Sequence, residues 1–377
     1  MKILVLCYEY PPIGGGGGRV AKTVAEALVQ RGHQVRVQTA GLGLDSERER
    51  IGGVDVYRTA SLRSVPDTCR VHEMGLYCAT SFLPALRHIR EWRPDVIHAH
   101  FAMPTGVLAW AIHRVTKFPY VLTAHLGDVP GGVPQQTDQL FRVVGPLARA
   151  VWKNAAAATA VSSFVQHLAR ESYQREVERV LNGIDLAGAA SPSPAKEVPR
   201  MVFVGRFNPQ KCPDFLIDVL ARLSGQPWHA TLIGDGPLMP TVRRKIETHG
   251  LADRITLTGW VDGSAVEQVL RDGDLFVMPS TSEGLPVAAI EALKQGLAIA
   301  ASDIPGVMDV VTDGTNGILL PVQDLAAWEA GLRTLLGDRA RLSAFKQASS
   351  QKVREFELGH VVDQYEAILL AAGAGRA

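Results

Sequence analysis

Residues 2–40 carry the pattern from which the fold class can be argued, and they read KILVLCYEYPPIGGGGGRVAKTVAEALVQRGHQVRVQTA. The first apolar run predicts a strand that is buried in a parallel sheet. A run of glycines follows, and then an amphipathic helix over residues 20–32 leads to a second strand over residues 33–40. Strand, crossover helix and strand together form the unit from which doubly wound parallel sheets are built.

The same alternation continues along the chain and begins again after residue 199. Further strands are predicted at residues 95–101, 120–126, 156–162, 200–207, 229–237, 254–261, 274–280, 298–303 and 317–322. Between the two series, residues 186–199 are rich in Ala, Ser and Pro and are typical of a linker. We therefore expect an N-terminal Rossmann-like domain over residues 1–188 and a second one over residues 189–355, with a C-terminal helix over residues 356–377 that crosses back to the first domain.

Composition excludes several classes of protein. The 377-residue chain has a formal net charge of +1 at pH 7, so no global field attracts nucleic acid. It contains no apolar run of about 18 residues that could span a membrane, and its N-terminal apolar run is too short for a signal peptide. The four cysteines (Cys7, Cys69, Cys78 and Cys212) show neither Cys-x-x-Cys pairs nor metal spacing, which favours a cytoplasmic protein with reduced thiols.

The glycine run Gly14–Gly18 is the first candidate site, because parallel sheets bind ligands beyond the carboxyl ends of their strands. Glycines there let backbone amides approach an anion at a helix N-terminus. A nicotinamide-dinucleotide loop is excluded, because Arg19 occupies the third glycine position and no acidic residue ends the second strand. A flexible loop without a ligand is the alternative interpretation.

A second candidate site follows the first strand of the second half, where residues 202–211 read VFVGRFNPQK. Arg206 and Lys211 are fixed cations in a strand-to-helix loop, and such a pair suits a diphosphate. Two solvated surface cations are the alternative.

A third candidate is the segment EGLPVAAIEALKQG, residues 283–296, which predicts a helix whose first turn contains Pro286. Glu283 is expected at the cap of this helix, where the next two backbone amides would favour phosphate or hydroxyl groups. Glu291 lies about 1.5 helical turns beyond Pro286 among apolar residues. A carboxylate that is buried there needs a partner, such as the two hydroxyls of a ribose, whereas a surface-facing Glu291 would not.

Taken together, these motifs resemble the family 4 retaining glycosyltransferases, which adopt the GT-B fold of two Rossmann-like domains facing a central cleft. The motifs are the glycine run, Asn-Gly-Ile-Asp at residues 182–185, Gly-Arg-x4-Lys at 205–211, Gly-Asp-Gly-Pro at 234–237 and Glu-x7-Glu at 283–291. The resemblance covers nearly the whole chain, and the set of motifs is more specific than any one of them.

The resemblance implies an activity and a set of site residues. It implies metal-independent, retaining transfer of a glucosyl, N-acetylglucosaminyl or mannosyl group from a nucleoside-diphosphate sugar to an acceptor hydroxyl, without another cofactor. A UDP-sugar is favoured over a GDP-sugar, and the acceptor is a small molecule, a glycan or a lipid-linked compound. The resemblance assigns catalysis to His125, Arg206, Lys211 and Glu283, donor binding to Gly15, Gly16, Gly17, Gly205, Gly284, Leu285 and Glu291, and acceptor orientation to Asp128. A packed core histidine is the alternative for His125. His98 and His100, near the end of the predicted strand over residues 95–101, are also candidates and rank below His125.

In the family's reaction, an oxygen of the donor phosphate takes the acceptor proton on the face from which the leaving group departs. The resemblance therefore names no protein residue as an obligatory base. A non-catalytic two-lobed sugar-binding protein is the second hypothesis, and the Arg206 and Lys211 pair counts against it.

Two further features of the sequence allow more than one interpretation. The Asp-x-Asp at residues 272–274 could hold a divalent metal ion, but we interpret it as turn chemistry. Residues 140–153 place Arg142, Arg149 and Lys153 among apolar side chains. Such a helix either contacts an anionic membrane surface, which would make the protein peripheral to the membrane, or packs against its own domain.

Overall fold

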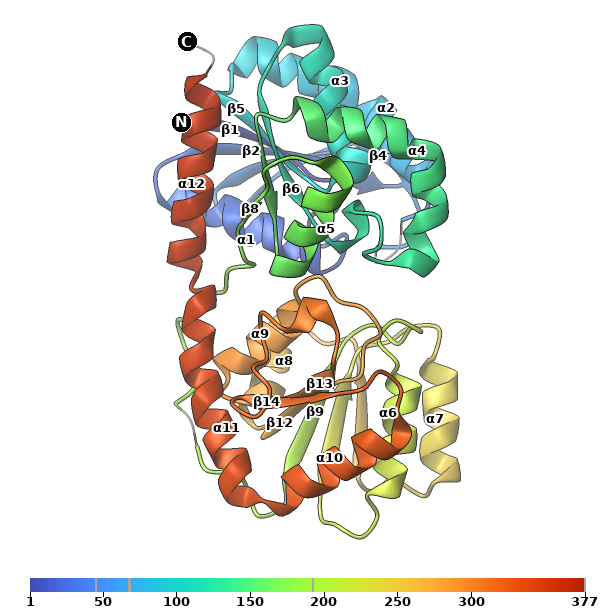
Figure 1. The fold of residues 1–377 in the computed structure, drawn as a ribbon. Coiled ribbons are helices and arrows are strands. Elements are labelled where there is room, and N and C mark those ends of the chain that lie inside the picture. The colour runs from blue at the N-terminus through green and yellow to red at the C-terminus, as the bar shows by residue number, and fades with distance from the viewer. Residues whose placement is uncertain (45, 67–68, 192, 376–377) are drawn as a thin grey trace. The chain divides into compact units, whose positions relative to one another are not determined.

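The computed structural model describes residues 1–44, 46–66, 69–191 and 193–375, excluding the side chains of 134–140. The chain divides into two compact units (Figure 1). Unit 1 comprises Met1–Asp185 and Leu358–Ala377, and unit 2 comprises Leu186–Glu357. The sequence predicted domain boundaries after residues 188 and 355, and the structure divides the chain after residues 185 and 357. Pro192 of the expected linker and residues 376–377 of the expected C-terminal helix lie outside the described residues.

Unit 1 is a mostly parallel sheet with helices on both faces. Its elements are β1 (Lys2–Leu6), α1 (Gly16–Gln30), β2 (Gln34–Leu42), β3 (Glu47–Ile51), β4 (Val54–Arg63), α2 (Val71–Arg87), η1 (His88–Trp92), β5 (Val96–His100), η2 (Ala102–Gly106), α3 (Val107–Thr116), β6 (Tyr120–Ala124), η3 (Leu126–Asp128), α4 (Pro134–Asn154), β7 (Ala157–Ala160), α5 (Ser163–Tyr173), β8 (Glu178–Arg179) and α12 (Leu358–Ala374). The strand order is β3-β4-β2-β1-β5-β6-β7-β8, and β3 pairs antiparallel with β4. In Figure 1, α1 and α12 lie on one face of this sheet and α2, α3 and α4 on the other.

The hairpin of β3 and β4 was not expected from the sequence. Gly52 and Gly53 form its turn, with φ values of 55° and 85° that glycine adopts readily. A Gly-Gly pair between two alternating segments is a hairpin signal, so the pattern was present in the sequence. The other strands predicted for this half correspond to β1, β2, β5, β6 and β7.

Unit 2 is a parallel sheet built on the strands predicted for the second half. Its elements are β9 (Arg200–Val204), α6 (Pro213–Arg222), β10 (His229–Ile233), α7 (Met239–Thr248), β11 (Ile255–Gly259), α8 (Gly263–Arg271), β12 (Leu275–Met278), α9 (Val287–Lys294), β13 (Ala298–Ser302), η4 (Pro305–Val307), β14 (Gly317–Leu320), α10 (Leu325–Gly337), α11 (Arg339–Lys352) and η5 (Val353–Phe356). The strand order is β11-β10-β9-β12-β13-β14.

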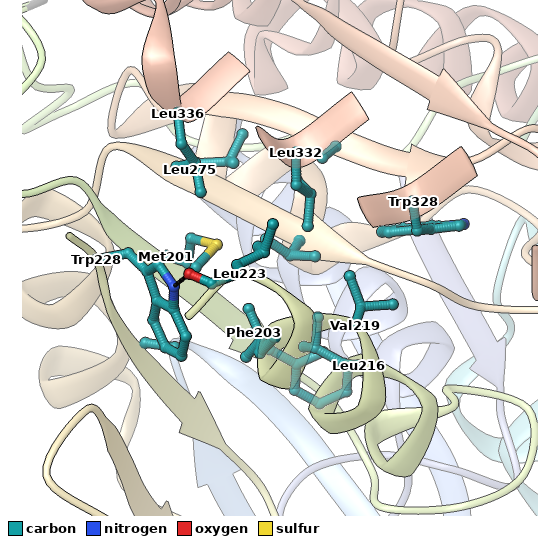
Figure 2. Close-up of a cluster of buried hydrophobic side chains, with 14 of the residues drawn as sticks. Met201, Phe203, Leu216, Val219, Leu223, Trp228, Leu275, Trp328, Leu332 and Leu336 are labelled. Atoms are coloured by element: carbon teal, nitrogen blue, oxygen red, sulfur yellow. Dashed lines mark hydrogen bonds between the residues drawn. The ribbon is translucent and has the colours of Figure 1, made fainter. Parts of the chain in front are cut away.

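A buried apolar cluster joins this sheet to α6 and α10 (Figure 2). Phe203 of β9 and Leu216 of α6 contribute to it, as does Trp328 of α10, which is fully buried. Trp228 is also buried, and its Nε1 donates a hydrogen bond of 3.0 Å to the carbonyl of Leu223. Truncating a buried Trp typically costs about 3–5 kcal/mol, so this cluster holds the sheet in place beneath its loops.

The helix expected over residues 140–153 lies within α4 and packs against its own unit. Val151 and Trp152 are fully buried, and Trp152 stacks on Tyr173 of α5 with ring centroids 4.5 Å apart. The three cations of the segment are exposed. The structure therefore favours the second interpretation of this helix. Across the described residues, no helix is both long enough and apolar enough to cross a bilayer.

Candidate functional site

The two halves of the unit 2 sheet diverge at β9, which is flanked by β10 and β12. Ligands of open parallel sheets bind at such a switch point, beyond the carboxyl ends of the strands. Two hydrogen bonds join the loops that follow β9 and β12. Gln210 Nε2 donates to the carbonyl of Ser282 at 2.9 Å, and the Thr281 amide donates to the carbonyl of Gln210 at 2.9 Å. The two loops therefore form one surface.

Lys211 and Glu283 form an ion pair on this surface. Lys211 Nζ lies 2.5 Å from Glu283 Oε1, and the side chains are 23% and 8% exposed. Asn208 Oδ1 accepts a hydrogen bond of 3.0 Å from the Lys211 amide, which fixes the turn that carries the lysine. Arg206 lies half-buried in the same turn. The structure thus brings three of the predicted site residues together on two adjoining loops.

Two glycines allow neighbouring loops to approach this surface closely. A Cβ on Gly234, in the loop after β10, would lie 1.9 Å from the carbonyl oxygen of Gly205. A Cβ on Gly306, in the loop after β13, would lie 1.7 Å from the carbonyl oxygen of Glu283 and 3.2 Å from that of Gly284. The loops after four strands therefore meet here. Sequence reasoning missed Gly306, although its Pro-Gly pair is a turn signal.

The expectation that Glu283 caps α9 is wrong. The helix begins at Val287, its N-cap is Pro286 in an extended conformation, and no side chain caps it. A residue that precedes proline disfavours the helical conformation, so Leu285 cannot continue the helix backwards, and its side chain is buried. Glu283 lies in the preceding loop instead. Glu291 lies in α9 and is half-buried, a position between the two alternatives considered for it.

The Asp-x-Asp of residues 272–274 has a structural role. Asp274 is fully buried, and its Oδ1 lies 2.7 Å from Lys346 Nζ. Its Oδ2 accepts a hydrogen bond of 3.0 Å from the Arg200 amide, which joins the starts of β12 and β9. This carboxylate is therefore committed to α11 and to the sheet. Among the described residues, no group of three or more His, Cys, Asp or Glu has an arrangement that could hold a metal ion.

In unit 1 the strand order reverses at β1, and α1 begins inside the glycine run, at Gly16. The alternative interpretation, a flexible loop, is therefore wrong, because part of the run is helical. A Cβ on Gly17 would lie 2.5 Å from Phe101 Cζ, and one on Gly18 would lie 2.7 Å from the carbonyl oxygen of Glu9. Close packing thus explains why glycines are needed in the first turn of this helix.

Glu9 is a residue of this site that sequence reasoning missed. Its Oε2 accepts a hydrogen bond of 3.0 Å from the Gly15 amide, so a carboxylate of the protein lies at the N-terminus of α1. Its Oε1 lies 3.7 Å from NH2 of Arg63, which is fully buried. The Gly15 amide, which we expected to face a ligand, therefore has an internal partner. The only sequence signal was an acidic residue just after the first strand.

His125 follows β6 and is largely buried. Its ring stacks on Phe101, with centroids 4.3 Å apart and an interplanar angle of 28°. Burial lowers the pKa of His125 to about 4, so the ring is neutral at pH 7. Within the described part of the chain, His125 Nε2 has no hydrogen-bond partner. It can therefore accept or donate a proton in a hydrogen bond to a ligand.

We expected Asp128 to orient the acceptor substrate, but its carboxylate binds backbone amides of the protein instead. The residue is 2% exposed, and its two oxygens accept hydrogen bonds from the amides of His125 (2.7 Å) and Met103 (3.1 Å). His98 and His100 of β5 are fully buried. His98 Nε2 lies 2.8 Å from Thr123 Oγ1, so both histidines are residues of the core beneath the site.

Comparison with known proteins identifies the family. Residues 14–187 match the family model "Glycosyltransferase Family 4", and residues 198–338 match "Glycosyl transferases group 1". The putative teichuronic acid biosynthesis glycosyltransferase TuaC of Bacillus subtilis is 30% identical over 289 residues, which cover 74% of this chain and 70% of that protein. The 2-deoxystreptamine N-acetyl-D-glucosaminyltransferase of Streptomyces fradiae is 29% identical, covering 85% of this chain and 82% of that protein.

Solved structures share the fold. Sucrose-phosphate synthase from Thermosynechococcus elongatus superposes with a TM-score of 0.86 at 20% identity, covering 99% of both chains. HepE from Anabaena, in complex with UDP and glucose, gives 0.79 at 21% identity, covering 98% of this chain and 100% of that one. The chain belongs to the family 4 glycosyltransferases of the GT-B fold. The fold class and family predicted from the sequence are confirmed, and a non-catalytic sugar-binding protein is not favoured.

Proposed function

We propose that the protein transfers a hexosyl group (glucosyl, N-acetylglucosaminyl or mannosyl) from a nucleoside-diphosphate sugar to an acceptor hydroxyl, with retention of the anomeric configuration. The observation that carries this proposal is the Lys211–Glu283 ion pair, which lies beside Arg206 at the switch point of unit 2. Cations fixed at this edge suit a diphosphate, and the carboxylate next to them suits sugar hydroxyls.

The chemistry of the leaving group sets the roles of these residues. As the bond from the anomeric carbon to the diphosphate breaks, negative charge grows on the diphosphate oxygens. Arg206 and Lys211 stabilise that charge, and losing one such group typically costs roughly 10²–10³ in rate. Glu291 accepts hydrogen bonds from the ribose hydroxyls, and Glu283 accepts them from the sugar. The acceptor proton passes to a donor phosphate oxygen, so no side chain is needed as a base.

UDP is the favoured nucleotide of the donor. HepE, with which the chain shares its fold, has been solved with UDP and glucose and with UDP-glucose. The relative from Streptomyces fradiae is named as an N-acetylglucosaminyltransferase. These observations support a UDP-hexose donor. The acceptor is a polyhydroxylated small molecule, a glycan or a lipid-linked compound.

No divalent ion is required for this proposal, because Arg206 and Lys211 supply the positive charge. Asp274, the acidic residue best placed by sequence to bind a metal ion, is already paired with Lys346.

The test of the proposed function is incubation of EDTA-treated protein with UDP-glucose, UDP-N-acetylglucosamine or GDP-mannose and a panel of polyol acceptors. Release of nucleoside diphosphate, and a product with the donor's anomeric configuration by NMR, are expected. Absence of release with every donor, or turnover only after Mn²⁺ is added, would contradict the proposal.

A further inference from the structure

Asp128 joins the loops that follow two neighbouring strands of unit 1. It ends the short helix η3, which follows β6, and its Oδ2 accepts the His125 amide within the same loop. Its Oδ1 accepts the amide of Met103, and the amide of Ala102 also donates to this carboxylate. Both residues belong to η2 in the loop after β5. Because all three bonds go to backbone groups, the carboxylate fixes the path of the main chain on both sides of the His125 ring.

The loop after β5 holds the surface on which the His125 ring lies. Phe101 has a φ of 73°, a left-handed conformation that is strained for a bulky residue. Its ring stacks on His125 on one side and meets Tyr8 edge-on, with centroids 4.9 Å apart. Gly17 lies against the same ring without room for a Cβ. A strained residue keeps its conformation only where its surroundings hold it, and the Asp128–Met103 bond lies two residues away.

We propose that Asp128 is a positioning residue that sets the orientation of the His125 imidazole by binding the amides of Met103 and His125 at once. This inference rests on the proposed transfer reaction, in which His125 Nε2, which has no partner among the described residues, forms a hydrogen bond to the bound substrate. An ionised carboxylate offers two acceptor oxygens, whereas the amide of asparagine offers one acceptor and one donor. Asparagine at this position therefore cannot accept from the amides of both loops at once, and it leaves the His125 amide or the η2 amides of Ala102 and Met103 unpaired.

The carboxylate needs to be ionised to accept hydrogen bonds from both loops. Burial raises the pKa of Asp128 to about 7. Below that pH, one oxygen carries a proton and becomes a donor, so one backbone amide loses its acceptor. Turnover is therefore expected to rise with pH through about 7, a range in which His125 itself, with a pKa of about 4, does not change charge.

The titratable groups that interact with Asp128 come from the end of β1 and from α5. The carboxylate of Glu9, after β1, is the charged group that faces Asp128. Cys7 and Tyr8, from the same end of β1, and Tyr173 of α5 also interact with it electrostatically. Burial raises the pKa of all three well above neutrality, so they stay uncharged between pH 6 and 8.

The test is a double-mutant cycle on the full-length protein with Asp128→Asn and His125→Ala. Misplacing a positioned group by about 1 Å can lower turnover by roughly 10²-fold. We expect Asp128→Asn to lower kcat by roughly 10–100-fold with little change in the donor KM, and to remove the inflection near pH 7. In the His125→Ala background the same substitution should have almost no further effect.

Glu73→Gln is the matched control for a general loss of stability. Glu73 is also a buried carboxylate of unit 1, and its Oε2 accepts a hydrogen bond of 2.6 Å from the Arg70 amide. The control should keep the wild-type kcat and pH profile. If Asp128→Asn lowers kcat by the same factor in the wild type and in the His125→Ala background, the inference is overturned, because Asp128 then acts independently of the imidazole. Wild-type turnover in His125→Ala would instead overturn the proposed role of His125.

A measurement on the wild-type protein covers the case in which Asp128→Asn does not fold. The ring carbon-bound proton signals of His125 can be followed by NMR between pH 6 and 8. We expect them to shift with an apparent pKa near 7, because the ring reports the ionisation of Asp128 through the loop. Signals that stay constant over this range would overturn the inference.

Discussion

Lys211 is the residue whose loss should affect turnover most directly. Lys211→Ala removes a fixed cation beside the departing diphosphate, so we expect kcat to fall roughly 10²–10³-fold. Lys245→Ala is the matched control. Lys245 of α7 is 27% exposed, against 23% for Lys211, and its Nζ forms an ion pair of the same length, 2.5 Å, with Asp218 of α6. Steady-state kinetics give kcat for both variants, and equal kcat values for the two would refute the assignment of Lys211.

Glu291 should act on binding rather than on turnover. Hydrogen bonds to a charged group are each worth about 1.5–3 kcal/mol, so Glu291→Ala should weaken binding of a UDP-sugar by roughly 10–100-fold. Titration calorimetry measures this directly. Glu247→Ala, at an exposed position of α7, provides the comparison and should bind as the wild type does. An unchanged affinity of the Glu291 variant would place the nucleoside elsewhere.

Some residues of the candidate sites can be predicted from the sequence, whereas others depend on contacts that only the folded chain makes. Arg206, Lys211 and Glu283 each follow a strand closely, so their strand-end positions can be found by locating strands. Glu9 could not be assigned in this way, because its position depends on Arg63, which comes from β4 and is 54 residues away in the chain. Asp128 was found, but its burial between two loops was not evident from its spacing to His125.

At the scale of elements, the start of α1 depends on glycines that have no room for a side chain. Gly17→Ala would place a Cβ 2.5 Å from the Phe101 ring, which stacks on His125. We expect this variant to lower both thermal stability and turnover, because Phe101 must move. Gly75→Ala in α2 is the control, since a Cβ there meets nothing within 4 Å and alanine in a helix gains up to about 1 kcal/mol. A Gly17 variant as stable and active as the wild type would contradict the packing described here.

The elements differ in how well the sequence predicts them. Buried parallel strands such as β6 and β13 are continuous apolar runs, and these were found. The start of α9 was predicted wrongly, because Pro286 is equally compatible with the first helical position and with the N-cap. Its extended backbone, with a ψ of 104°, places it at the N-cap. The hairpin of β3 and β4 was missed because its polar β3 carries little hydrophobic signal.

At the scale of the whole molecule, the buried histidines of unit 1 should make stability depend on pH. Burial lowers the pKa of His98 to about 3 and that of His125 to about 4, and it also lowers the pKa of His100. The unfolded chain binds protons at these positions below about pH 6.5, whereas the native state does not. The free energy of unfolding should therefore fall as the pH drops from about 6.5 toward 4.

Asp128 contributes with the opposite sign, because its pKa is raised in the native state, but one carboxyl group opposes three histidines. Urea titrations at pH 7 and pH 5 measure the difference. His98→Leu should reduce it, whereas His167→Gln, an exposed position in α5, should leave it unchanged. Equal pH dependence in the wild type and in His98→Leu would contradict the buried, neutral state of this histidine.

The donor site of unit 2 is tested most directly by a crystal structure of the protein with UDP bound. We expect the guanidinium of Arg206 and the ammonium of Lys211 within hydrogen-bond distance of the diphosphate oxygens, and the carboxylate of Glu291 on the ribose hydroxyls. A nucleotide bound at another edge of the sheet, with both cations directed into solvent, would contradict the proposed function at its centre.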